Sequence, residues 1–199
     1  MTGFHRFGLL APVAAISLSS CGVNSVPTAE EQVNAAWGNL QSEYQRRAEL
    51  IPNLVATVKG YAQQEKSVLV EVTEARAKAS SIQLNASDLS DPAKVQAFAN
   101  AQGQLGGSLG RLLATIEAYP DLKSNANFLT LQSQLEGTEN SILVARRDYN
   151  EAVRSYNVRI RTFPDAIGAK IFYGAKPKVP FEASAAAQAA PKVDFNTAG

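Results

Sequence analysis

Histidine and cysteine are almost absent from this 199-residue chain, which contains one of each, His5 and Cys21. Both lie near the N-terminus. If the first twenty residues are removed and the Cys21 thiol is capped, the remaining chain has no histidine and no free thiol. Their absence excludes cysteine nucleophiles, Ser-His-Asp triads, histidine bases and nearly all zinc sites. It also excludes di-metal bundles that use Glu-x-x-His. We therefore expect no catalytic residue, metal site or cofactor.

The N-terminus has the pattern of an export signal. "MTGFHRFG" carries one arginine and no acid, and the apolar run Leu9–Leu18 and two serines follow. The run is ten residues long and contains Pro12, whereas a spanning helix needs about 20 residues. "LSSC" resembles a bacterial lipobox. The sequence therefore predicts a signal peptide over residues 1–20 and lipidation of Cys21.

An ordinary cleaved signal that leaves a free thiol is the alternative, but an unpaired cysteine in an exported protein is then hard to explain. Lipidation would make the membrane a partner and would place the protein in the bacterial cell envelope, on the extracytoplasmic side. Gly22 after the cysteine favours the outer membrane, periplasmic side, if the host is diderm. The 19 basic and 18 acidic residues give no basic surplus for nucleic acid, so none is expected as a partner.

After a tether over residues 21–28, a heptad pattern begins at Val33. One set of core positions is Val33, Leu40, Arg47, Leu54, Tyr61, Val68, Ala75 and Ile82; the other is Trp37, Tyr44, Ile51, Val58, Glu65, Val72 and Ala79. Only Arg47 and Glu65 are charged, which indicates a left-handed bundle seam. Pro52 predicts a kink. Because the phase survives Pro52 and Gly60, we expect a kinked continuous first helix or two nearly collinear helices.

Two more helices follow. Asp91 with Pro92, and then Ser124 or Asn125, have the residue types of helix starts. Their apolar stripes run from Val95 to Tyr119 and from Phe128 to Phe163, and Pro164 ends the second. Residues 165–174 are expected to cover one end of the bundle, and residues 175–199 to form a flexible Pro/Ala-rich tail. The predicted fold is an all-α, elongated antiparallel four-helix bundle over residues 29–174.

Gly103, Gly106, Gly107 and Gly110 lie on one face of the expected helix. Each costs about 1 kcal/mol of helix stability relative to alanine, so a compensating role is expected. Close approach of a neighbouring bundle helix is the favoured interpretation. A docking groove for a partner helix and local fraying are the alternatives.

A polar stripe accompanies the last apolar stripe. Its members are Asn140, Arg147, Asn150, Glu151, Arg154 and Asn157, with Arg47 on the first helix. Ion pairs between helices, such as Glu43 or Glu49 with Arg147 or Arg154, would explain it; a recognition face for another envelope protein is the sharper hypothesis. Arg47 at a core position predicts a buried or semi-buried ion pair, because an unpaired buried charge is costly.

Three stretches closely resemble the LemA family: "QRRAELIPNLVATVKGYAQQEKSVLVEVTEARAKA", "EAYPDLKSNANFLTLQSQLEGTENSILVARRDYNEAVRSYNVRIRTFP" and "AKIFYG". The resemblance covers roughly Trp37 to Gly174. It implies a membrane-anchored, extracytoplasmic, bromodomain-like helical bundle with no established enzyme activity. Here a lipobox stands in place of the family's usual N-terminal transmembrane helix, and the tail looks like an addition.

These observations together predict a lipid-anchored, non-enzymatic interaction or scaffold module whose partner is another envelope protein. A periplasmic carrier of a hydrophobic ligand is the first alternative, with the glycine face opening a slot between helices. A hydrolase that uses only carboxylates and hydroxyls is the second.

Overall fold

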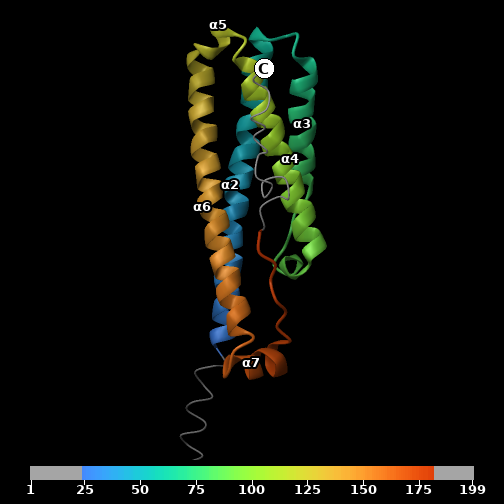
Figure 1. Cartoon of the computed structure of the whole chain (residues 1–199), viewed down its shortest axis with the longest axis vertical. Helices are drawn as coiled ribbons and strands as arrows, with labels where there is room; N and C mark the ends of the chain where they lie inside the picture. Colours follow the sequence, from blue (N-terminus) through green and yellow to red (C-terminus); the bar gives the residue numbers. More distant parts are fainter. Residues whose placement is uncertain (1–23, 182–199) are drawn as a thin grey trace, which may run out of the picture.

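The computed structural model describes residues 24–181, and within them all regular structure is helical (Figure 1). The predicted signal peptide and Cys21 lie outside these residues. Four long helices form the body: α2 (Ser25–Tyr61), α3 (Lys66–Ser81), α4 (Pro92–Ile116) and α6 (Ala126–Arg159). The short elements are η1 (Asp88–Ser90), α5 (Pro120–Lys123), α7 (Asp165–Gly168) and the π-helical turn η2 (Ala169–Tyr173).

The long helices alternate in direction along the bundle, which confirms the all-α antiparallel fold (Figure 1). α2 packs most extensively on α6, and α3 packs on α4 and α2. Pro52 lies within α2, which continues without interruption to Tyr61. The chain does not reverse at residues 50–54, which agrees with the expectation of a helix that continues through Pro52.

The chain does reverse after Tyr61, so the expectation of a continuous or collinear helix past Gly60 is wrong. Residues 62–65 form the turn, and α3 returns antiparallel to α2 (Figure 1). The heptad pattern holds only in part beyond the turn: Val72 and Ala79 are buried as predicted, but Tyr61 is exposed and Leu69, which is not a heptad position, is buried. Periodicity reports which face of a helix is buried and carries no information on its direction.

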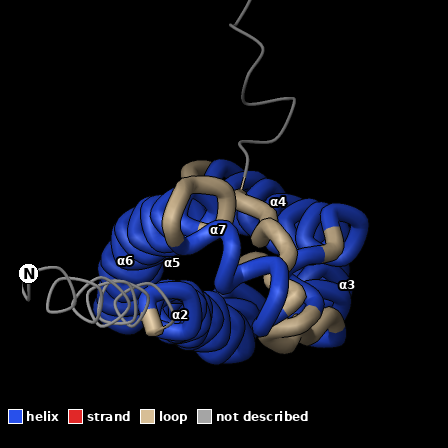
Figure 2. The backbone as a smooth tube through the Cα atoms, turned by 90° about the horizontal axis from the view of Figure 1, so that it is seen from below, coloured by secondary structure: helices blue, strands red, loops and turns tan. Residues whose placement is uncertain are grey.

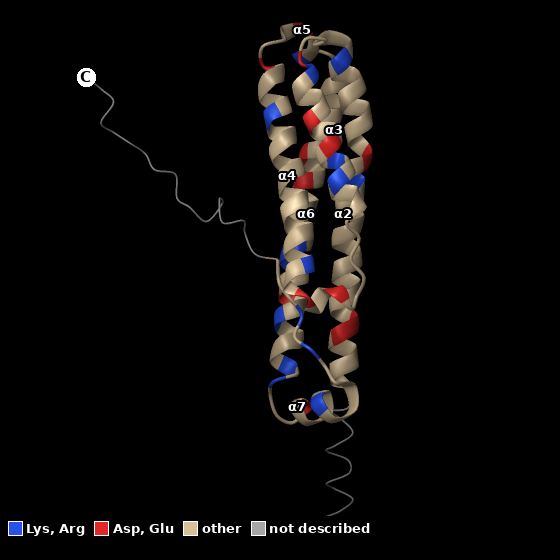
Figure 3. Ribbon diagram, turned by 90° about the vertical axis from the view of Figure 1, so that its right-hand side faces the viewer, with Lys and Arg blue, Asp and Glu red and all other residues tan. Residues whose placement is uncertain are grey.

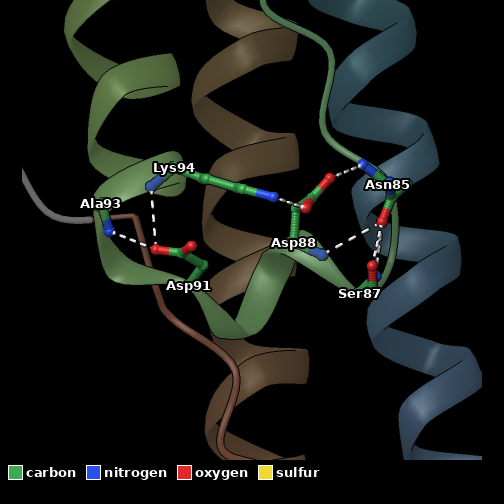
Figure 4. Close-up of polar contacts among 6 residues, drawn as sticks. All are labelled: Asn85, Ser87, Asp88, Asp91, Ala93 and Lys94. Atoms are coloured by element: carbon green, nitrogen blue, oxygen red, sulfur yellow. Dashed lines mark hydrogen bonds and ion pairs between the residues drawn. The ribbon is translucent and has the colours of Figure 1, made fainter.

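The predicted helix starts of α4 and α6 are confirmed by their caps. The Asp91 side chain accepts hydrogen bonds from the backbone N–H groups of Ala93 and Lys94, and Pro92 is the first helical residue (Figure 4). Lys94 also donates to Asp88, and this hydrogen bond, together with one from the Asn85 backbone, lowers the pKa of the Asp88 carboxyl. Asn125 caps α6 in the same way as Asp91 caps α4.

Two clusters of buried side chains fill the bundle. The lower cluster is aromatic, with Trp37, Tyr44, Phe98, Tyr149, Tyr156 and Phe181 among its members. The upper cluster is mainly aliphatic and includes Ile51, Leu54, Val72, Leu105, Leu112 and Ile116. Arg47 lies on α2 between Tyr44 of the lower cluster and Ile51 of the upper one, so a polar residue interrupts the core at mid-height.

The ends of the bundle differ from the expected boundaries. Residues 25–28, expected in the tether, form the first turn of α2, and Val26 is buried. α7 and η2 lie across the lower end, where α2 begins (Figures 1 and 2). Residues 175–181, expected in the flexible tail, run back along the bundle and bury Phe181.

Both signs of charge are spread along the long helices (Figure 3). Within residues 24–181, no helix combines the length and the apolar character that crossing a lipid bilayer requires.

Candidate interaction surface

Arg47 is the centre of a polar layer that reaches all four long helices. Its Nη1 lies 3.0 Å from the Glu139 carboxylate on α6, and its Nη2 donates to the Gln102 side chain (2.7 Å) and carbonyl (3.1 Å) on α4. The Gln102 amide in turn donates to the Ala79 carbonyl on α3, at 3.4 Å. The predicted ion pair of Arg47 is therefore present, with Glu139 as its partner.

The layer is asymmetric in its exposure. The Arg47 side chain is 4% exposed, whereas that of Glu139 is 45% exposed and reaches solvent. The guanidinium also stands over the Tyr44 ring, 5.2 Å from its centroid. Burial raises the pKa of Tyr44, although the nearby Arg146 and Arg47 cations oppose the rise. The Arg47 Nε has no hydrogen-bond partner, so the network leaves one donor unsatisfied.

α4 and α6 hardly touch each other, so the bundle is open along this side. A groove of about 270 Å³ lies between them, lined by residues including Arg47, Gly103, Gly106, Glu139 and Leu143. A second groove, of about 640 Å³, runs on the other side of α4, between α3 and α4. Its lining residues include Ala75, Ala99, Gly103 and Gly107, with Glu71, Glu74, Lys78 and Arg111.

The glycines of α4 do not mark a close approach of helices within this chain. An added Cβ would meet nothing within 4 Å at Gly103 or Gly110. At Gly106 it would lie 3.7 Å from Arg47 Nη1 and at Gly107 3.9 Å from Arg111 Nη1, both ordinary contacts with side-chain ends. The structure therefore contradicts the favoured sequence interpretation. The neighbouring helices pack on the leucine stripe of α4, and the glycine stripe beside it faces outward.

Asn150 and Asn157 of the predicted polar stripe hold the C-terminal segment, residues 175–181. Asn157 donates to the Lys178 carbonyl and accepts from its N–H, both at 2.8 Å. Asn150 does the same to Phe181, at 2.9 and 2.7 Å. The asparagines are seven residues apart on a helix, or about 10.5 Å, and three extended residues span about 10 Å. The two spacings match, so α6 binds the segment as an extended peptide.

Further contacts fix the same segment. The Val179 N–H donates to the Leu89 carbonyl of η1 at 2.8 Å, and the Tyr149 hydroxyl donates to the Val179 carbonyl at 2.9 Å. Lys178, although buried, reaches the Ala86 carbonyl and the Glu30 carboxylate. Phe181 packs among Trp37, Phe98 and Tyr149 with ring centroids 5.5–6.1 Å apart. The segment thus closes the lower part of the α4–α6 opening (Figure 1).

The other stripe residues lie at the surface. Glu151 and Arg154 pair with each other at 3.1 Å, and both are exposed. Arg147 and Asn140 are exposed, and Asn140 lines a groove on the α2 side of α6. The expected pairs of Glu43 or Glu49 with Arg147 or Arg154 are not formed; Glu43 approaches Arg46 instead, and Glu49 accepts from Gln45.

Sequence reasoning missed Gln102, Glu139, Lys178 and Phe181. Gln102 was visible as the one polar residue in the apolar stripe of α4. The alternation of Val179 and Phe181 around Pro180 was a weak strand-like signal, because a residue before proline favours extended backbone.

The buried polar residues of the described chain are Arg47, Gln102, Ser108, Thr138 and Lys178, and none is a carboxylate. Between residues 24 and 181, no group of three or more His, Cys, Asp or Glu is placed to hold a metal ion.

The sequence profile of the LemA family matches residues 36–195. Since the match continues to residue 195, the interpretation of the tail as an addition to the family pattern is wrong. Magnetosome protein MamQ 2 of Paramagnetospirillum magneticum is 28% identical over 172 residues, which cover 78% of this chain and 63% of that protein. Protein LemA of Metamycoplasma hominis is 26% identical over 140 residues, 70% of this chain and 60% of that protein. The chain thus spans less than two thirds of these relatives.

Proposed function

Because the chain belongs to the LemA family, we propose that it is a lipid-anchored interaction module of the bacterial cell envelope, without enzymatic activity, that docks a helix of another envelope protein. Membership of this family and similarity to MamQ indicate a membrane-associated helical protein. The observation that carries the finer proposal is the glycine stripe of α4, where an added Cβ would meet either nothing or only the end of an arginine side chain.

The low helix propensity of glycine is the reason to expect that a partner binds at these residues. Each exposed helical glycine costs about 1 kcal/mol relative to alanine, and packing within the described chain does not offset this cost. Glycine admits close approach of another backbone because it has no side chain. A partner helix lying in the α3–α4 groove would gain such an approach at Gly103 and Gly107.

The groove also has the composition of an interface. Ala75, Ala99, Gly103 and Gly107 supply small apolar surface. Charged side chains accompany them, with an ion pair between Arg111 and Glu71 and a hydrogen bond from Lys78 to Gln104. An apolar centre with a polar rim is typical of protein–protein interfaces.

The alternatives have less support. A carrier needs an internal apolar space, but the two side-chain clusters fill the described interior and the grooves lie between helices at its surface. A hydrolase with paired buried carboxylates is disfavoured because the buried polar residues of the described part include none.

Photo-crosslinking in intact cells tests the proposal. A photoreactive amino acid at Gln104, which lies between the glycines, should crosslink to an envelope protein that mass spectrometry identifies. Gly107→Leu should abolish this crosslink and leave the melting temperature unchanged or raised. Gly137→Leu is the matched control, because Gly137 is also an exposed helical glycine with open space at its Cβ but lies on α6. A crosslink that survives Gly107→Leu would exclude the glycine stripe as the docking surface.

Lipid attachment is tested separately. Cys21→Ala should lose lipid labelling and accumulate as uncleaved precursor or soluble protein. Unchanged membrane attachment of this variant would refute lipidation and would point to the apolar run Leu9–Leu18 as the anchor.

A further inference from the structure

The lower end of the bundle exposes large apolar side chains. Phe163 is 82% exposed, Ile171 69%, Phe172 68% and Ile167 53%. These four residues, here named the apolar tip, lie on α7, η2 and the loop that leads to them. Contiguous exposed apolar surface in a stable protein marks a binding site for a protein or a membrane.

The exposed charges of the segment that carries the apolar tip are positive, although Glu31 near the start of α2 is also exposed at this end of the bundle. Between residues 159 and 176 there are four basic residues and one acid. The acid, Asp165, is half-buried and pairs with Arg159 at 3.8 Å, whereas Arg161, Lys170 and Lys176 are exposed. Aromatic and aliphatic side chains surrounded by exposed lysine and arginine are the pattern of segments that lie at an anionic lipid surface.

The start of the described chain lies at the same end. α2 begins at Ser25 and contacts α7, so the start of α2 lies at the same end of the bundle as the apolar tip (Figures 1 and 2). Cys21 is four residues before Ser25, and four residues span at most about 14 Å. An anchor at Cys21 therefore holds this end close to the bilayer.

We propose that the apolar tip inserts into the headgroup region of an anionic bilayer, so that the bundle stands on the membrane with α5 farthest from it. The inference deepens the proposed function, because the anchor sets which end faces the membrane. Phe172, Ile171 and Phe163 enter the apolar boundary, and Lys170, Lys176 and Arg161 meet lipid phosphates. The tip then fixes the orientation of the rod, and the α3–α4 groove points sideways, parallel to the membrane plane.

Site-specific fluorescence in vesicles tests this inference. In the lipidated mature protein, acylated Cys21 has no free thiol, so Phe172→Cys provides a single site for an environment-sensitive fluorophore. In vesicles of phosphatidylethanolamine and phosphatidylglycerol, its emission should shift to the blue and be quenched several-fold by lipid-borne nitroxides. The matched control is Leu129→Cys, which is 50% exposed at the opposite end of the bundle; its fluorophore should remain unquenched.

A second variant tests whether quenching at position 172 arises from insertion of the apolar tip. Ile167→Asp with Ile171→Asp should reduce quenching at position 172 to the level at position 129, with little change in melting temperature because both side chains are exposed. Leu143→Asp, at an exposed apolar site on mid-α6, should leave the quenching intact. Equal quenching at positions 172 and 129 would overturn the inference. A blue-shifted fluorophore at position 172 without vesicles would also overturn it, since protein would then cover the tip.

Lipidation of Cys21 is tested independently of tip insertion. A parent chain that reacts with a thiol reagent has a free Cys21, which refutes lipidation but does not bear on the tip. In a Cys21→Ser background, quenching at position 172 above that at position 129 would support tip insertion by itself, and equal quenching would overturn it.

Discussion

Arg76 of α3 donates a 2.7 Å hydrogen bond from its Nε to the carbonyl of Ala48 on α2. Ala48 lies four residues before Pro52, so its carbonyl is the one that proline leaves without an intrahelical donor. A side chain from the neighbouring helix thus supplies the hydrogen bond that the proline removes. This contact explains how α2 accommodates Pro52 without ending.

A double-mutant cycle measures this relationship. Arg76→Ala should lower the free energy of unfolding by about 1–2 kcal/mol, because it leaves the Ala48 carbonyl unpaired. In a Pro52→Ala background the cost should be smaller, since residue 52 then donates to that carbonyl. Denaturant titration of the four proteins gives the coupling energy, and Arg154→Ala at an exposed site is the control. If Arg76→Ala lowers the free energy of unfolding equally in both backgrounds, its hydrogen bond does not compensate for the one that Pro52 removes.

Substitution of the α4 glycines by alanine should change stability in the direction expected for helical sites with open space around them. Gly103→Ala and Gly110→Ala should each raise the free energy of unfolding by up to about 1 kcal/mol, since an added Cβ meets nothing. Gly174→Ala should act in the opposite direction and cost about 1 kcal/mol, because Gly174 has a positive φ of 55°. Thermal unfolding of the three variants checks the signs. Destabilisation by both α4 substitutions would restore the idea of close helix packing.

Removing the asparagine contacts should release the C-terminal segment. Asn150→Ala and Asn157→Ala each remove two hydrogen bonds to its backbone and should cost about 1–3 kcal/mol. Amide hydrogen exchange at Val179 and Phe181 should accelerate in both. Arg154→Ala, on the same helix but in an exposed pair, should leave exchange at these amides unchanged. Protection that persists in both asparagine variants would mean that the other contacts of the segment, those of Lys178, Val179 and Phe181, are sufficient to hold it.

Substitutions at Arg47 and at Glu139, the buried and the exposed members of the polar layer, should lower the free energy of unfolding by different amounts. Arg47→Ala should cost about 2–4 kcal/mol, because it opens a cavity and leaves the side-chain oxygen of the buried Gln102 without its donor. Glu139→Gln should cost less than about 1 kcal/mol, since the carboxylate is half-exposed and glutamine keeps an acceptor. Chemical denaturation provides both values. A large loss in Glu139→Gln would show that the charge, rather than the hydrogen bond, stabilises the layer.

Buried tyrosines predict loss of stability at high pH. Burial, with a contribution from Glu30, raises the pKa of Tyr156 to about 12, and burial also raises the pKa of Tyr149. An unfolded tyrosine ionises near about 10, so above that pH the unfolded state loses protons that the folded state keeps. Stability should therefore be full below pH 10 and fall as the pH rises towards 12. Tyr156→Phe should make the decline shallower, and an unchanged slope would contradict the assignment to Tyr156.

The sequence by itself determined the helical class, the buried faces and the helix starts. Heptad spacing identified Trp37, Leu40 and Leu54 as core residues, and all three are buried. Asp91 marked the start of α4, and Ser124 or Asn125 that of α6, because a cap depends on a side chain and the backbone a few residues away; the structure has Asn125 as the cap. The unfavourable position of Arg47 in an apolar stripe was sufficient to predict an ion pair.

Only the tertiary structure decided the direction of α3, the partner of Arg47 and the environment of the α4 glycines. Each depends on residues distant in sequence, such as Glu139, which lies 92 residues after Arg47. The same holds for Asn150 and Asn157: their polarity suggested a surface stripe, but the chain beyond residue 174 folds back to use their amides. Local periodicity specifies which face of a helix is buried, whereas direction and partner choice follow from how the buried faces of all four helices fit together.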